Sequence, residues 1–72
     1  MEDRYQVLGG PTRDNEFEEY VNVLRELGLS LERDRQGRLG VVDSEEMANR
    51  ILDGLWRREA TRWIAWMIVP VP

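Results

Sequence analysis

A glycine-rich stretch near the N-terminus is the first place where residue types and spacing could support chemistry. It lies between an alternating segment and a helical one, and its candidate ligands are Gly9, Gly10, Thr12 and Arg13. Backbone amides and the positive end of a helix dipole can hold an anion at such a loop. The glycine spacing is not that of a phosphate-binding Walker loop, and the chain has no lysine. The stretch therefore predicts a small-anion site, and a connection that only needs a permissive backbone is the alternative.

Arginines form a second candidate site around a predicted turn at residues 35–37. Arg33, Arg35 and Arg38 could together grip a phosphate or a carboxylate. Glu32 and Asp34 are interleaved with them and largely neutralise their charge. A solvated turn with local ion pairs, which contribute little stability, is the alternative interpretation.

Other kinds of chemistry are mostly excluded by composition. The chain has neither cysteine nor histidine, so it lacks thiol and imidazole ligands for metals and the usual nucleophile–base pairs. Its carboxylates do not lie in apolar stretches that would raise a pKa for general-acid work. We therefore expect a protein that is not an enzyme and uses no cofactor or metal.

An acidic ridge is expected on the outward face of the helix predicted over residues 15–27. It consists of Glu16, Glu18, Glu19 and Glu26, with Arg25 as the lone counter-charge. Such a charged face is usually just solvated, but it could also engage a basic surface. Small phage- or mobile-element-encoded inhibitors of nucleic-acid enzymes, anti-CRISPR proteins among them, often work through acidic surfaces. An inhibitor of this class is therefore an alternative function.

Charge and hydropathy limit the partners further. The net charge of −4 argues against direct nucleic-acid binding, which needs a basic footprint. The first residues, MEDRYQ, differ from a secretory signal, and the apolar C-terminal run is shorter than the roughly 20 residues of a membrane helix. We expect a single cytoplasmic domain over residues 1–72 that contacts neither membrane nor nucleic acid.

Hydrophobic periodicity predicts six elements in the order strand, helix, strand, strand, helix, strand. The strands are expected at 4–8, 29–34, 38–42 and 62–69, and the helices at 15–27 and from Asp43 or Ser44 to about Glu59. This order is that of a ferredoxin-like α+β fold, a four-stranded antiparallel sheet with both helices on one face.

The last predicted strand is apolar on both faces. In the ferredoxin-like order it is an edge strand, so one of its two alternating sets would be exposed in a monomer, and such an edge is normally covered. We therefore predict a homodimer through this strand, with a misplaced element of the same chain as the alternative cover. The predicted interface residues are Ile64, Trp66, Ile68, Trp63 and Met67. The leading function is a non-catalytic interaction module that binds itself and another protein.

Overall fold

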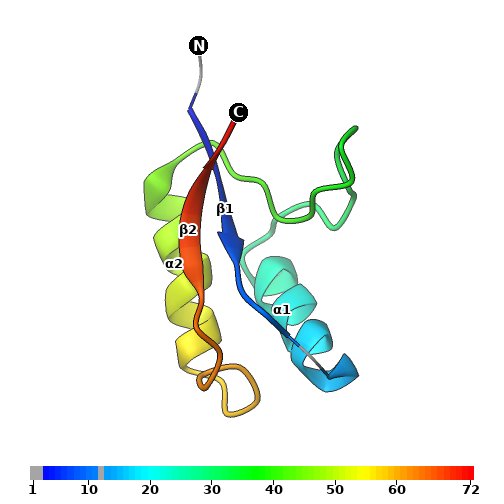
Figure 1. The fold of residues 1–72 in the computed structure, drawn as a ribbon, viewed down its shortest axis with the longest axis vertical. Coiled ribbons are helices and arrows are strands. Elements are labelled where there is room, and N and C mark those ends of the chain that lie inside the picture. Colours follow the sequence, from blue (N-terminus) through cyan, green and yellow to red (C-terminus); the bar gives the residue numbers. More distant parts are fainter. Residues whose placement is uncertain (1–2, 12) are drawn as a thin grey trace.

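The computed structural model describes residues 3–11 and 13–72. Strands β1 (Arg4–Leu8) and β2 (Met67–Val71) form a two-stranded antiparallel sheet, and helices α1 (Asp14–Glu26) and α2 (Glu45–Trp56) lie between them in the chain. In the register, Val7 faces Ile68 and Leu8 faces Met67. Figure 1 shows the two strands side by side, with α2 packed against them and α1 packed against α2.

The predicted four-stranded ferredoxin-like sheet is wrong, because the chain forms a smaller α+β domain with two strands. Residues 29–43 contribute only one bridge, in which Tyr5 and Val42 exchange N–H···O bonds of 2.8 and 2.9 Å. Gly40 explains the failure: its φ of 75° interrupts an extended strand. A Cβ there would lie 2.5 Å from the Tyr20 hydroxyl, so only glycine fits.

The turn inside this segment is confirmed although its flanking strands do not form. Gly37 has a φ of 78°, in the left-handed region. The Asp34 Oδ1 atom accepts N–H bonds from Gln36 at 3.0 Å and from Arg38 at 2.8 Å. The side chain of Asp34 therefore stabilises the turn locally, without a ladder of strand hydrogen bonds.

Helix α1 lies within one residue of its predicted bounds at each end. At its C-terminus the Leu29 N–H donates to the Leu24 carbonyl at 2.9 Å, and the Gly28 N–H donates to the Arg25 carbonyl at 3.0 Å. Gly28 has a φ of 73°. These are the two bonds of a Schellman cap, which explains why the helix ends where the glycine stands.

Helix α2 begins after Ser44, whose Oγ accepts the Met47 N–H at 3.1 Å. It ends at Trp56, before the predicted Glu59. Its interior Gly54 costs about 1 kcal/mol of helix propensity. A Cβ at Gly54 would lie 3.0 Å from a methyl group of Val23, so the glycine lets α1 and α2 approach closely.

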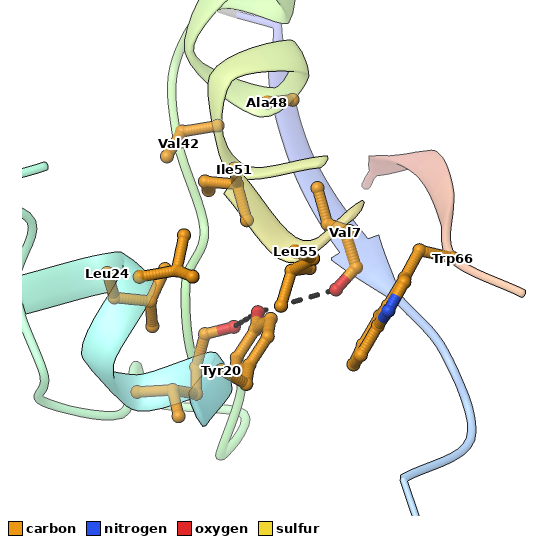
Figure 2. Packing of buried hydrophobic residues seen from close by; sticks show 10 residues of the cluster. Val7, Tyr20, Leu24, Val42, Ala48, Ile51, Leu55 and Trp66 are labelled. Atoms are coloured by element: carbon orange, nitrogen blue, oxygen red, sulfur yellow. Dashed lines mark hydrogen bonds between the residues drawn. The ribbon is translucent and has the colours of Figure 1, made fainter. Parts of the chain in front are cut away.

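The core lies between α2, the inner face of the sheet and α1, as Figure 2 shows. Its most buried members come from all three, and they are Val7, Leu24, Ala48, Ile51 and Leu55. Because one face of the two-stranded sheet packs on α2, the sheet has the helical support that an isolated hairpin lacks.

Candidate functional site

Trp66, predicted at an interface, is a core residue of the single chain. It is 7% exposed, and its ring stacks on Tyr20 with centroids 5.6 Å apart and planes 11° apart. Its indole N–H donates to the Thr61 carbonyl at 2.9 Å. The buried ring and its satisfied N–H show that part of the apolar C-terminal segment is covered by the chain itself.

The residues before Trp66 turn instead of extending, which moves the last strand from its predicted position. The Arg62 N–H donates to the Arg58 carbonyl at 2.9 Å, and the Ile64 N–H donates to the Thr61 carbonyl at 3.1 Å. The Thr61 hydroxyl, fully buried, donates to the Leu55 carbonyl at 2.5 Å. These bonds hold residues 57–64 in turns, so β2 begins at Met67 and not at residue 62.

The remaining predicted interface residues divide between the core and the surface. Ile64 and Ile68 are half-buried and pack against the core. Met67 is 60% exposed and Trp63 is 81% exposed. The Arg62 guanidinium lies 5.3 Å from the centroid of the Trp63 ring, a cation–π contact at the surface.

The sheet face opposite α2 carries an outer apolar strip. Val7 and Ile68 point toward the core, so their neighbours along each strand point outward. The strip consists of Leu8, Met67, Val69 and Val71, with Gln6 and Arg4 beside them in the register. Leu8 and Met67, directly opposite each other, are its most exposed pair.

The free edge of β2 offers few hydrogen-bond donors. The Tyr5 N–H donates to the Val42 carbonyl and the Tyr5 carbonyl accepts the Val42 N–H, on the side of β1 away from β2. Along an antiparallel pair of strands, hydrogen-bonded and non-hydrogen-bonded residue pairs alternate. Tyr5 and Pro70 form a non-hydrogen-bonded pair, so the backbone groups of Pro70 point away from β1, to the free edge of β2. Proline has no N–H, and a strand added at this edge would miss that bond.

The predicted acidic ridge is largely occupied by contacts within the chain, so Arg25 is not the lone counter-charge. The Arg58 guanidinium donates to Glu19 Oε2 at 2.8 Å and also pairs with Glu26. Hydrogen bonds from Arg58 and from Asn22 hold the pKa of the Glu19 carboxyl below its usual value. Two of the four ridge carboxylates thus join α1 to the residue that follows the α2 C-cap.

The other two ridge residues have different roles. Glu16 Oε1 accepts the N–H of Arg13, the N-cap residue of α1, at 3.1 Å. Its carboxylate therefore occupies the positive end of the helix dipole. Glu18 is exposed on α1.

The predicted anion loop has another structural purpose at Gly9. A Cβ on Gly9 would lie 2.4 Å from the Trp66 ring, so the glycine makes room for that ring. Gly10 has open space around it, and Thr12 lies outside the described residues. The Arg13 N–H already binds the Glu16 carboxylate, which would compete with an incoming anion.

A groove that was not predicted from the sequence lies beside Trp66. This Trp66 groove has a volume of about 280 Å³ and is lined by Gln6, Val7, Leu8, Gly9, Pro11, Phe17, Tyr20, Arg33, Gly37, Arg38, Leu39 and Trp66. The charged residues in its lining are Arg33 and Arg38. The arginine cluster around the turn was the signal in the sequence, but apart from Leu39 its apolar neighbours come from three distant segments of the chain.

Within residues 3–11 and 13–72, no group of three or more acidic side chains is placed to hold a metal ion. No helix of the described chain has the length and apolar character needed to cross a bilayer. Comparisons with protein-family models, with curated proteins and with solved structures gave no match.

Proposed function

We propose that the protein is a non-catalytic interaction module that forms a homodimer through its outer apolar strip. The observation that carries this proposal is the exposure of Met67 and Leu8 on a sheet face that α2 does not cover. Contiguous exposed apolar side chains generally mark an interaction surface. Trp63, more exposed than either, lies in the turn that leads toward β2 and extends the apolar surface of the same segment.

A second copy of the chain suits this strip better than a charged partner does. The four strip residues are all apolar, and the charged residue in line with them is Arg4 at one end. Arg4 donates to the Pro72 carbonyl at 3.2 Å. In a two-fold arrangement with the strands antiparallel, the two Arg4 side chains lie at opposite ends, so like charges do not meet.

Stacking of sheet faces is favoured over pairing of β2 edges. Pro70 removes one backbone donor from the free edge, so an intermolecular ladder there would be incomplete. Two sheet faces packed about 10 Å apart need no backbone hydrogen bonds between them. The apolar side chains of the strip supply the contact in that arrangement.

The test is sedimentation equilibrium or light scattering over a wide range of concentration. We expect the wild type to be a dimer and Met67→Glu to be a monomer, because a dimer would bury two unpaired carboxylates. Leu31→Glu is the matched control, since Leu31 is also an exposed apolar residue but lies on the 29–43 segment. Far-UV circular dichroism checks that both variants are folded. A wild type that stays monomeric at millimolar concentration would refute the proposal.

A further inference from the structure

The Trp66 groove combines apolar walls with a positive rim. Side chains of Phe17, Leu39 and Trp66 contribute the apolar surface, and Arg33 and Arg38 are the charged residues of the lining. This is unusual in a chain whose net charge is −4. A groove of this kind matches a ligand with an apolar body and a single negative group.

The two arginines keep donors available for such a group. Arg33 uses Nη1 to donate to the Gly37 carbonyl at 2.8 Å and makes no ion pair within the described residues. Arg38 forms an ion pair with Asp34 Oδ2 at 3.9 Å, which is too long for a hydrogen bond, while Asp34 Oδ1 accepts backbone N–H groups. A guanidinium has five N–H donors, so most of those on Arg33 and Arg38 have no hydrogen-bond partner among residues 3–11 and 13–72.

The polar atoms inside the groove favour an apolar body over a polar one. The Tyr20 hydroxyl donates to the carbonyls of Val7 and Leu39, at 3.3 and 3.4 Å. The Trp66 indole N–H donates to the Thr61 carbonyl. With these donors used inside the protein, the ring faces and aliphatic groups are left to contact a ligand.

A second, larger hollow provides a contrast within the same molecule. It has a volume of about 500 Å³, and Arg33 and Arg38 line it too, together with Arg4. Its lining also contains the carboxylates of Glu32, Asp34 and Asp43. With both signs present, that hollow does not select for an anion.

We propose that the Trp66 groove binds the C-terminal residue of a partner peptide, with an apolar side chain in the hollow and the α-carboxylate on Arg33 and Arg38. The volume suits one large side chain rather than a drug-sized molecule. Arginine binds carboxylates through paired, charge-assisted N–H bonds, and capture of a terminal carboxylate is a recurring mode of peptide recognition. The proposal does not rest on the homodimer, although Leu8 belongs both to the groove and to the outer apolar strip.

The test uses two probes that differ only in their C-terminal group, a carboxylate in N-acetyl-phenylalanine and a carboxamide in N-acetyl-phenylalaninamide. Each is titrated into the ¹⁵N-labelled full chain while the indole N–H signals of Trp66 and Trp63 are followed by NMR. Fragments of this size bind in the millimolar range. We expect the acid to shift the Trp66 signal with saturation, and the amide to bind roughly tenfold more weakly for want of the charge-assisted bonds.

Variants identify the carboxylate site. Arg33→Met or Arg38→Met should remove most of the preference for the acid while keeping the weak binding of the amide. Arg35→Met is the matched control, because Arg35 belongs to the same turn but lines neither hollow, and it should behave as wild type. Equal affinity for the two probes, shifts at Trp63 in place of Trp66, or a preference that survives both substitutions would overturn the proposal.

Discussion

Trp66 and Trp63 stand three residues apart, and the fold treats them in opposite ways. Trp66 is 7% exposed, stacked on Tyr20 and hydrogen-bonded through its indole N–H. Trp63 is 81% exposed and contacts the Arg62 guanidinium. The chain thus divides its most apolar segment into an inner part, which completes the core, and an outer part, which remains exposed.

The difference shows that burial depends on what surrounding residues provide. Trp66 is accommodated because Gly9 leaves space for its ring and because the Thr61 carbonyl accepts its N–H. Within the described residues Trp63 makes no such hydrogen bond, and it lies in a surface turn. Hydrophobicity alone does not distinguish the two, since both are tryptophan.

The largest expected difference in stability is between the two variants that each remove one of these tryptophan rings. Trp66→Ala should lower the free energy of unfolding by about 3–5 kcal/mol, because it empties a packed site. Trp63→Ala should change it by less than about 0.5 kcal/mol in the monomer. Urea denaturation at a concentration low enough to avoid self-association measures both values. Similar losses in the two variants would mean that Trp63 is also a core residue.

A smaller effect is expected when the space for the Trp66 ring is reduced. Gly9→Ala places a Cβ 2.4 Å from a ring carbon, and overpacking of this kind costs about 1–3 kcal/mol. Gly10→Ala is the matched control, because nothing lies within 4 Å of a Cβ there. Thermal unfolding measures this loss, as the difference in melting temperature between each variant and wild type. A Gly9 variant as stable as the Gly10 variant would show that the ring moves freely.

The hydroxyl of Tyr20 is expected to contribute less than the rings. Tyr20→Phe keeps the stacking on Trp66 and loses the hydrogen bonds to Val7 and Leu39, which should cost about 1 kcal/mol. Burial raises the pKa of this hydroxyl, so the neutral form is the one the fold stabilises. Stability from this group is present below the tyrosine pKa of the unfolded chain and is lost as the pH rises through the folded value. Denaturation of wild type and Tyr20→Phe at neutral and alkaline pH should therefore converge as pH rises.

The smallest effect concerns the turn that separates the two tryptophans from α2. Arg58→Met should weaken the contact between this turn and α1, because Glu19 and Glu26 lose their partner. The pKa of Glu19 is lowered in the folded chain, so its contribution is present above the unfolded pKa and is lost as the pH falls through the folded value. The melting temperature of wild type should fall more steeply with acidification than that of Arg58→Met.

Arg57→Met is the control for that comparison. Arg57 forms an ion pair with Asp53 one turn earlier in the same exposed stretch, at 3.0 Å. Exposed i,i+4 pairs add only about 0.3–0.5 kcal/mol, and this one does not join two elements. An acid response that is the same in both variants would show that Arg58 does not hold α1 in place.

The sequence was a good guide wherever the determining interactions are local. The strand at Arg4–Leu8 and the start of α2 after Asp43 or Ser44 were predicted, since each depends on neighbouring residues. The segment 29–43 was predicted wrongly because alternation alone does not reveal that Gly40 must adopt a positive φ beneath the Tyr20 hydroxyl. That contact joins residues far apart in the chain.

The candidate sites were predictable only in part, for the same reason. The apolar C-terminal segment was recognised, but its division at Trp66 depends on Gly9, Tyr20 and Thr61, which periodicity does not link. The ridge on α1 was recognised as acidic. Its neutralisation depends on Arg58, which follows the other helix and lies more than 30 residues away in the sequence.

The pairing of β1 with β2 determines when the sheet can form during synthesis. The helices and their caps are formed by local contacts, which arise quickly. β1 is synthesised before both helices, but its partner residues Met67–Val71 are added only after them. Until then Val7 lacks the cross-strand Ile68 and Tyr20 lacks the Trp66 ring. The sheet therefore cannot form until Met67–Val71 have been made, and a ribosome that stops before Met67 releases a chain without it.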